Sequence, residues 1–364
     1  MIRILWLSPN FNHYKARFLN HLAKESEIEL SVLSGSGRSQ MGDKKITANW
    51  NFRHIEKSVS KQKFGWSIPI VRHLKSVFSD FDWVLIPAEK KNLPLFLYLL
   101  YLRKSNPSTK LISYNHPILK SKKGKTTLLD RVLTKFYFNK LDRVIFYTEE
   151  SYKYMVNENK IISPEKAFWA NNTLDNIEIA KNYTFNLPPA NQFNILFIGR
   201  LIATKRLDDL LKYYAQLKVV ISGLKLEIIG DGPQKNIIES AIMQDDSIIW
   251  HGAVVDESEI APIMQRSSLI FVPGHSGLSI NHAFAYGRPY ITLRGSSHAP
   301  EIDYIDNGKN GYILSDDNEV VKKISELLKN REKLENFCHS ANEKGKRLSV
   351  QNWVQQIKIS LMHE

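Results

Sequence analysis

Short, mainly apolar runs alternate with amphipathic segments along the chain. In the first half, an amphipathic segment spans residues 15–24, and apolar runs span residues 2–7, 28–33, 83–86, 111–114 and 144–147. An apolar run of this length predicts a strand that is buried on both faces, and its alternation with helices predicts a wound parallel sheet. We therefore expect an α/β fold.

Three predicted strands in the second half run straight into a glycine turn. They lie within residues 193–200, 226–233 and 268–278. Glycine directly after a strand lets backbone amides approach a ligand closely, and open parallel sheets bind ligands at the carboxyl ends of their strands. These segments predict a nucleotide or phosphate site in the second half.

The two halves are separated by a short segment of different composition. Residues 183–192 contain two prolines among polar residues and have no hydrophobic period, which indicates a linker. We expect one domain over residues 1–182 and a second over residues 193–340, each long enough to bury its own core. A final helical segment is expected over residues 341–364.

The excess of positive charge lies in the first half. The net charge is +13, and residues 1–180 carry 29 Lys and Arg against 16 Asp and Glu. Four lysines gather in one predicted loop, at Lys120, Lys122, Lys123 and Lys125. This basic loop predicts docking of the first domain on an anionic membrane surface. The alternative is a solvated surface that only keeps the protein soluble. No nucleic-acid motif accompanies the charge, so no nucleic-acid partner is expected.

The longest apolar run spans residues 93–102, about half of the roughly 20 residues that a membrane-spanning helix needs. It is either the start of a buried helix, with Pro94 in its first turn, or a face that dips into a membrane. No secretory signal is expected, because the chain opens directly on a buried strand. The single cysteine, Cys338, excludes an intramolecular disulfide and fits a reducing compartment. We therefore expect a cytoplasmic protein, peripheral on the inner face of the cell membrane.

Two cations follow the first glycine turn of the second half. Arg200 comes directly after a predicted strand, and Lys205 enters the next helix. Both can hold one diphosphate, because Arg binds phosphate bidentately and Lys acts as a point charge; the alternative is two solvated loop cations. The helix expected to start near Gly277, Leu278 and Ser279 would add its positive end. Cations and helix together can stabilise a departing nucleoside diphosphate without a metal or other cofactor.

The order and spacing of these motifs resemble the family-4 retaining glycosyltransferases of the GT-B fold, of the type that builds bacterial cell-surface polysaccharides. The shared motifs are Ile198-Gly-Arg-Leu with Lys205, Ile229-Gly-Asp-Gly-Pro233, His251-Gly-Ala, Gly277-Leu278, His282-Ala-Phe-Ala-Tyr-Gly-Arg-Pro289, Pro300-Glu301-Ile302 and Asp306-Asn-Gly-Lys-Asn-Gly311. In the first half, residues 148–151 and 171–175 are similar to further segments of the family.

The resemblance implies two Rossmann-like domains facing across a cleft, with the C-terminal helix returning to the first domain. It implies transfer of a hexosyl group, with retention of configuration, from a UDP- or GDP-linked donor. The acceptor would be a hydroxyl group of a glycan or lipid-linked molecule, in the synthesis of a surface polysaccharide such as lipopolysaccharide. Two other functions stay open, because fold does not fix function. One is a catalytically silent, nucleotide-sugar-binding scaffold subunit of a polysaccharide assembly complex, and the other is a sugar-nucleotide epimerase or a phosphorylase.

The main departure from the family concerns two glutamates that are usually separated by seven residues. The second glutamate position falls on His282, and the first is missing, with His275 and Ser276 as the nearest polar substitutes. His282 either hydrogen-bonds a ribose hydroxyl or is a packed helix histidine. The motif matches also imply contacts with the donor nucleotide or sugar from Gly199, Gly230, His251, His275, Ser276 and Glu301. For Glu301, the alternative is a helix cap.

Three residues of the first half are candidates for the acceptor side and for catalysis. His116 follows a predicted strand, where the resemblance implies a histidine facing the donor sugar. A neutral histidine can orient a hydroxyl or help to stabilise the transition state; the alternative is a loop-capping histidine. Asn10 and His13 follow the first strand, where an acceptor would approach, although the family's glycine-rich version of this loop is absent.

Overall fold

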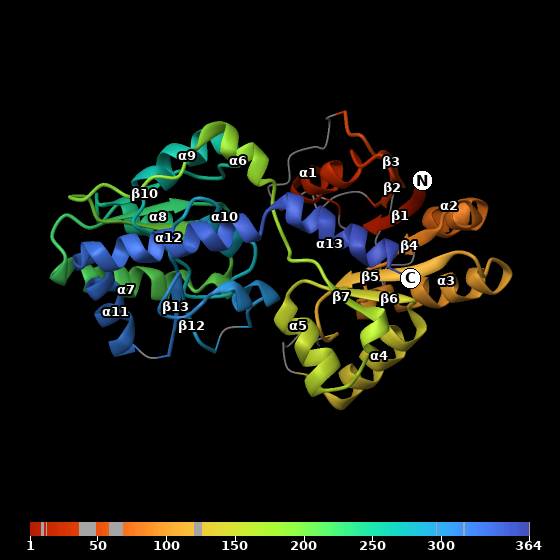
Figure 1. Ribbon diagram of the computed structural model, residues 1–364. Helices are drawn as coiled ribbons and strands as arrows, with labels where there is room; N and C mark the ends of the chain where they lie inside the picture. The colour runs from red at the N-terminus through yellow and green to blue at the C-terminus, as the bar shows by residue number, and fades with distance from the viewer. Residues whose placement is uncertain are drawn as a thin grey trace. The chain divides into compact units, whose positions relative to one another are not determined.

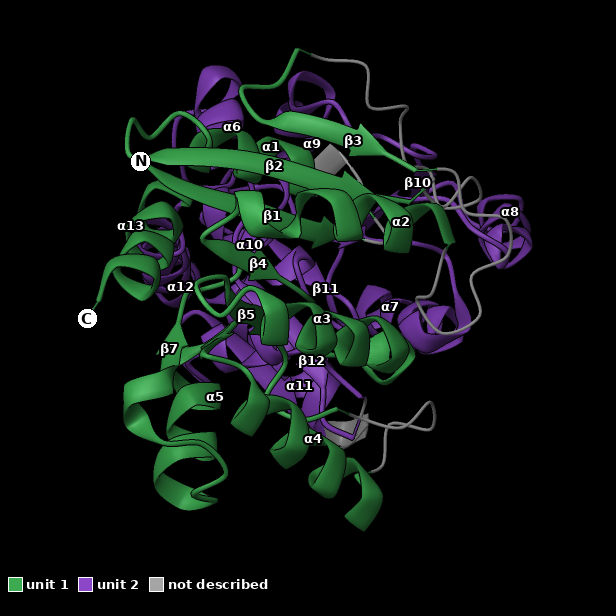
Figure 2. Ribbon diagram, turned by 90° about the vertical axis from the view of Figure 1, so that its right-hand side faces the viewer, with its two compact units in different colours: residues 1–172, 350–364 green, residues 173–349 purple. Residues whose placement is uncertain are grey.

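The computed structural model describes residues 1–8, 11, 13–35, 49–57, 68–119, 126–295, 297–315 and 317–363. The chain divides into two compact units, shown in different colours in Figure 2. The first unit is Met1–Asn172 together with Val350–Glu364, and the second is Thr173–Ser349. The division therefore falls after Asn172, somewhat before the segment that the sequence analysis takes as the linker.

The first unit is built on a parallel sheet with the strand order β3-β2-β1-β4-β5-β6-β7. Its strands are β1 (Ile2–Ser8), β2 (Ile28–Ser34), β3 (Arg53–Glu56), β4 (Trp83–Leu85), β5 (Lys110–Asn115), β6 (Arg143–Phe146) and β7 (Ala167–Trp169). Its helices include α1 (His13–Leu22), α2 (Ile68–Val77), α3 (Leu93–Ser105), α4 (Leu128–Lys140) and α5 (Glu149–Lys153). The five segments of the first half that were predicted as strands all contribute to this sheet, which confirms the expected α/β class.

The last helix of the chain, α13 (Val350–Met362), belongs to the first unit (Figure 1). Trp353 is 1% exposed, and its ring packs against those of Phe18, Trp6 and Tyr114, at centroid distances of 4.8, 6.2 and 6.2 Å. At the other end of α13, the Arg143 guanidinium donates to the carbonyl oxygens of Ser360 and His363. The return of the chain to the first unit therefore begins at Val350, and Trp353 is the largest side chain that α13 buries there.

The second unit is built on a parallel sheet with the strand order β10-β9-β8-β11-β12-β13. Its strands are β8 (Asn194–Ile198), β9 (Lys225–Ile229), β10 (Ile248–Trp250), β11 (Leu269–Phe271), β12 (Tyr290–Leu293) and β13 (Gly311–Leu314). Its helices include α6 (Asn176–Asn182), α7 (Leu207–Val220), α8 (Lys235–Ile242), α9 (Glu257–Arg266), α10 (Ser279–Ala285), α11 (Asp317–Lys329) and α12 (Arg331–Arg347). The order reverses between β8 and β11, and doubly wound sheets bind ligands at such a point, outside the carboxyl ends of the strands.

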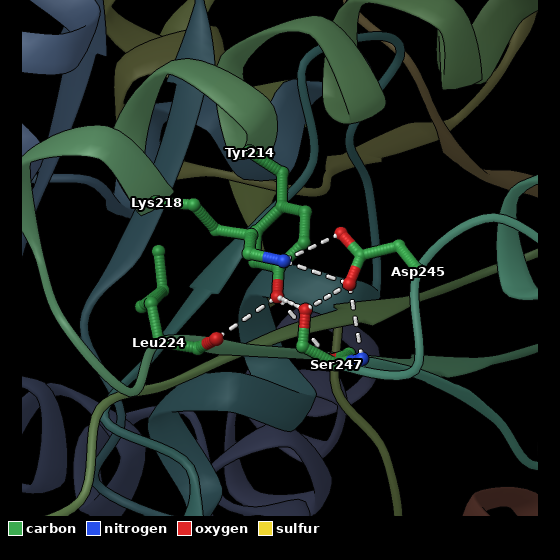
Figure 3. Close-up of polar contacts among 5 residues, drawn as sticks. All are labelled: Tyr214, Lys218, Leu224, Asp245 and Ser247. Atoms are coloured by element: carbon green, nitrogen blue, oxygen red, sulfur yellow. Dashed lines mark hydrogen bonds and ion pairs between the residues drawn. The ribbon is translucent and has the colours of Figure 1, made fainter.

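The amino ends of β9 and β10 are held by a polar network, shown in Figure 3. The Tyr214 hydroxyl, on α7, lies 2.9 Å from the Leu224 carbonyl oxygen and 2.7 Å from Ser247 Oγ. Lys218, one helical turn further along, donates to both carboxylate oxygens of Asp245, at 2.7 and 2.8 Å. Burial raises the pKa of Tyr214 to about 12, so its hydroxyl remains a hydrogen-bond donor at neutral pH. These residues fix α7 at the edge of the sheet opposite to the expected ligand site.

Replacing Tyr214 by phenylalanine is expected to lower the free energy of unfolding by about 1–3 kcal/mol, because the buried Leu224 carbonyl loses its donor. Urea denaturation measures the change, and nucleotide affinity should stay at the wild-type value. Tyr101→Phe is the matched control, since Tyr101 is 65% exposed and loses the same hydroxyl. Equal stability of the two variants would contradict a structural role for this network.

Among the helices that the structure describes, none combines the length and the apolar character needed to span a membrane.

Candidate functional site

Three glycine turns lie in close contact at the carboxyl ends of β8, β9 and β11. A Cβ atom on Gly230, which has φ +148°, would lie only 1.9 Å from the carbonyl oxygen of Gly199. A Cβ atom on Gly274 would lie 2.1 Å from the carbonyl oxygen of Thr204. No larger residue fits at either position without movement of the backbone, so glycine is what allows these loops to meet at the point where the strand order reverses.

Lys205 lies between two of these loops. It ends the short 3-10 helix Ala203–Lys205, is 8% exposed, and its Nζ donates to the carbonyl oxygen of His275, at 2.6 Å. The backbone amide of His275 donates in return to the carbonyl oxygen of Thr204, at 2.7 Å. A Cβ atom on Gly199 would lie 3.4 Å from the Lys205 Nζ, so the amine also faces the turn after β8. The two loops are thus joined through one lysine.

The electrostatics of Lys205 are unusual for a buried cation. Burial, and then the charge of the half-buried Arg200, lower the pKa of the lysine to about 8. The ion pairs found among the described residues include neither Lys205 nor Arg200. Buried charges are normally paired, because an uncompensated charge is costly in a poorly solvated site. Two neighbouring cations without a protein carboxylate favour the binding of an anion at this edge of the sheet.

The loop from Gly274 to Leu278 brings the start of α10 to the same edge. Leu278 is the N-cap of α10, and among the described residues no side chain caps this helix start. A Cβ atom on Gly277 would lie 3.4 Å from Ala299 Cβ and 3.9 Å from Glu301 Oε2. The carboxyl group of Glu301, which is only 3% exposed, therefore lies beside the loop that precedes α10.

The polar side chains of this loop have partners within the protein. The Ser276 hydroxyl is fully buried and accepts from the Tyr290 hydroxyl at 3.0 Å, and the Ser276 amide donates to His298 Nδ1 at 3.2 Å. The Ser279 hydroxyl lies 2.8 Å from the Tyr290 hydroxyl, and the His275 ring donates through Nδ1 to the carbonyl oxygen of Ser297. These bonds hold the backbone of the loop. Donor contacts from Ser276, Ser279 and His275 stay predictions.

His282 lies on α10 and takes part in a buried polar cluster. Its Nε2 is 3.1 Å from Glu257 Oε2, and the Tyr286 hydroxyl donates to the same oxygen at 2.7 Å. His282 is 7% exposed and Glu257 is 5% exposed. The packing role that the sequence left open for His282 is thus present in the structure, and its contact with a ribose stays a prediction. Sequence reasoning missed Glu257, which shows only as an acidic residue in the first turn of a helix.

His251 takes part in a second buried cluster. Its Nε2 lies 2.8 Å from Glu227 Oε2, and Glu227 is 1% exposed. Arg266 binds the same carboxylate through two nitrogens, at 2.7 and 2.6 Å. A donor contact from His251 therefore stays a prediction, whereas its bond to Glu227 is structural. Glu227 was also missed from the sequence, although a glutamate within an apolar strand was the available signal.

The candidates of the first half belong to the other unit, and only one of them is described fully. His116 follows β5, its side chain is exposed, and its ring meets that of Tyr147 edge to face at 4.9 Å. Asn10 and the loop with Lys120, Lys122, Lys123 and Lys125 lie outside the described residues. His13 begins α1, but its side chain is not described. No group of His, Cys, Asp and Glu suited to a metal ion occurs in the part of the chain that the structure describes.

Known proteins resemble the chain in both sequence and structure. Residues 192–330 match the family described as glycosyl transferases group 1. Over 229 residues the chain is 25% identical to the poly(glycerol-phosphate) alpha-glucosyltransferase of Bacillus subtilis (strain 168), a match that covers 61% of this chain and 32% of that protein. The chain thus spans about a third of the length of this curated relative.

Several solved structures share the fold over nearly the whole chain. Anabaena Alr3699/HepE in complex with UDP-glucose has a TM-score of 0.71 and 14% identity, with 99% of each chain covered. Sucrose-phosphate synthase from Thermosynechococcus elongatus has a TM-score of 0.71 and 14% identity, with 98% of each chain covered. A mutant of S. aureus TarM, in complex with Fondaparinux, alpha-GlcNAc-glycerol and UDP, has a TM-score of 0.68 and 12% identity, with 100% of each chain covered.

These likenesses confirm the GT-B fold with two Rossmann-like units. The match to the family described as glycosyl transferases group 1 covers residues 192–330, in the unit that contains Arg200, Lys205 and Glu301.

Proposed function

We propose that this protein transfers a sugar from a nucleotide-sugar donor to a hydroxyl group of a glycan or lipid-linked acceptor, in the synthesis of a surface polysaccharide. The observation that carries this proposal is the buried amine of Lys205, which lies beside Arg200 at the reversal point of the sheet and forms no ion pair within the described residues. The diphosphate of a nucleotide sugar supplies the missing negative charge. The relatives support the choice of ligand, since solved structures of the same fold contain UDP, glucose or UDP-glucose.

In this proposal the second unit stabilises the leaving group. As the bond between the sugar and the diphosphate breaks, negative charge grows on the phosphate oxygens. Arg200 binds them bidentately, Lys205 acts as a point charge, and the backbone amides of Leu278 and Ser279 donate hydrogen bonds. Glu301 and His282 contact the donor sugar and ribose. His116 orients a hydroxyl or stabilises the transition state, and Asn10 and His13 lie on the acceptor side.

Retention of the anomeric configuration is the finer part of the proposal, and it rests on the resemblance to retaining enzymes. A panel of UDP- and GDP-sugars in a thermal-shift assay should first identify the donor. Transfer or hydrolysis of that donor by the pure protein, followed by nuclear magnetic resonance of the product, then tests the stereochemistry. Donor binding without turnover would favour the scaffold function instead, and an inverted product would contradict retention.

Nucleotide binding is expected to be independent of divalent metal, because Arg200 and Lys205 provide the charge that a metal would otherwise supply. Calorimetric titration with UDP and with GDP, each with and without EDTA, measures this. The affinity for the preferred nucleotide should be unchanged by the chelator. A loss of binding with EDTA would show that a metal takes part.

We also propose that the protein acts at the inner face of the cell membrane, where a lipid-linked acceptor is available. The excess of Lys and Arg in residues 1–180 supports this location, since anionic lipids attract basic surfaces in a way that salt screens.

A further inference from the structure

The outer surface of α4 is apolar although it faces solvent. Leu128, Leu129 and Val132 are 79%, 64% and 57% exposed. The opposite face of the helix is buried through Asp130, Thr134, Tyr137 and Phe138. Large apolar side chains gathered on one exposed face mark an interaction surface, whereas single exposed ones are common.

Helix α3 packs against α4 and has exposed apolar side chains of its own. Phe96 of α3 stacks on Tyr137 of α4 with ring centroids 4.3 Å apart, and it meets Phe136 edge to face at 6.2 Å. On the outer side of α3, Leu97 is 49% exposed and Tyr101 is 65% exposed. We call Leu97, Tyr101, Leu128, Leu129 and Val132 the α3/α4 apolar face; both helices are labelled in Figure 1.

The exposed charged side chains of the helices α3 and α4 are all of one sign. The exposed charged residues of α4 are Arg131, Lys135 and Lys140, and α3 adds Lys104. Asp130 is the one acidic residue of α4; it is fully buried, accepts from the Thr127 amide and pairs with Lys90. On these two helices, cations therefore flank exposed apolar side chains with no exposed anion between them.

From this arrangement we infer that the α3/α4 apolar face inserts into the interface of an anionic phospholipid bilayer. A helix with apolar residues on one face and Lys and Arg at its borders lies in the plane of a membrane, with its apolar side chains among the headgroups and upper acyl chains. Anionic lipids complement the flanking cations, whereas a second copy of this chain would bring cation against cation. The inference rests on the membrane location given under the proposed function. It adds that apolar side chains of α3 and α4 are buried in the bilayer, besides the attraction between charges.

Sedimentation with vesicles tests the inference. The wild-type protein should pellet with vesicles of phosphatidylcholine and phosphatidylglycerol, and much less with phosphatidylcholine alone. The double variant Leu129→Glu/Val132→Glu should bind the anionic vesicles at least about tenfold more weakly, because it loses two apolar contacts and meets lipids of like charge.

The matched control is Val219→Glu/Met243→Glu, in the second unit. These side chains are 86% and 85% exposed, and the substitutions make the same change in net charge. This control should bind anionic vesicles within about twofold of the wild type. Equal loss in the two double variants would show that only net charge matters and would overturn the inference. The inference would also be overturned if the wild type does not bind vesicles. It would be overturned as well if the wild type is a dimer in solution and only Leu129→Glu/Val132→Glu is a monomer, because the surface would then be a contact between two copies of the chain.

A second measurement reports insertion directly and does not depend on loss of binding. An environment-sensitive dye is attached at Val132→Cys, and at Val219→Cys as the control; the native Cys338 is fully buried. The emission of the dye should shift to shorter wavelength with anionic vesicles at position 132 and not at position 219. An unshifted spectrum at position 132 with bound protein would contradict insertion. The variants should also be titrated with UDP in the absence of vesicles. Unchanged UDP affinity would show that the substitutions affect membrane binding and not the nucleotide site.

Discussion

Replacing Lys205 by alanine is expected to lower the turnover of the nucleotide-sugar donor by at least about tenfold, with little change in stability. The reason is the position of the amine, which is 8% exposed at the reversal point of the sheet and beside Arg200. A charge-assisted hydrogen bond is worth about 1.5–3 kcal/mol, which corresponds to roughly tenfold or more. Steady-state kinetics with the preferred donor measure the effect.

Two further variants complete this test. Arg200→Ala should show a loss of similar size, because both side chains are proposed to bind the same diphosphate. Lys218→Ala is the matched control, since it removes a lysine that pairs with Asp245 at the opposite edge of the same sheet. Near-normal kinetics of both Lys205→Ala and Arg200→Ala would remove this pair from the donor site.

The depressed pKa of Lys205 makes nucleotide affinity depend on pH. Burial, and then Arg200, lower this pKa to about 8, so the amine of the free protein loses its proton as the pH rises through 8. A bound diphosphate stabilises the charged form and raises the pKa, so binding above pH 8 requires the uptake of a proton. The affinity for UDP or GDP should therefore fall between about pH 8 and 10 in the wild type. In Lys205→Ala the nucleotide affinity should be weak and nearly constant over this pH range. An equal fall in affinity in both proteins would contradict the role of Lys205 in this pH dependence.

Replacing Trp353 by alanine is expected to lower the free energy of unfolding by about 3–5 kcal/mol, the usual range for a large aromatic residue removed from a core. Trp353 is 1% exposed and packs on Phe18, Trp6 and Tyr114. It is therefore the largest buried side chain that holds α13 against the first unit. Urea denaturation followed by circular dichroism measures the loss.

The same helix provides the control for this prediction. Ile359→Ala also shortens an apolar side chain of α13, but Ile359 is 57% exposed, so the change should be below about 0.5 kcal/mol. Trp353→Phe should fall between the two, because it keeps part of the buried ring. If Trp353→Ala and Ile359→Ala have the same free energy of unfolding, the packing of Trp353 does not stabilise α13 against the first unit.

The two clusters around Glu227 and Glu257 explain why the histidines of the second unit were hard to interpret from sequence. A histidine near a glycine turn suggests a ligand contact, because an imidazole can donate to or accept from a hydroxyl. In the folded chain, His251 and His282 each meet a buried carboxylate instead, at 2.8 and 3.1 Å. Their partners lie 24 and 25 positions away, and no local pattern in the sequence predicts such pairs.

The sequence by itself determined the class of fold, and it predicted the place of a phosphate site. The short apolar runs become strands because a strand of a parallel sheet covered by helices is buried on both faces, so that neighbouring side chains of the run all leave water. Glycine is needed at positions 230 and 274 because the backbones of neighbouring loops meet there, and a Cβ atom would clash. These features can be predicted from sequence because each strand or turn is marked by its own neighbouring residues.

Only the tertiary structure decided which side chains are partners and which surfaces remain exposed. The burial of Lys205, and hence its lowered pKa, depends on loops that follow two different strands. The apolar run at residues 93–102 lies in α3, where Phe96 is buried and Leu97 is exposed, and whether the exposed face of this helix meets a membrane stays a prediction. The sequence left this choice open because burial is set by the elements that pack against a helix, and these come from distant parts of the chain.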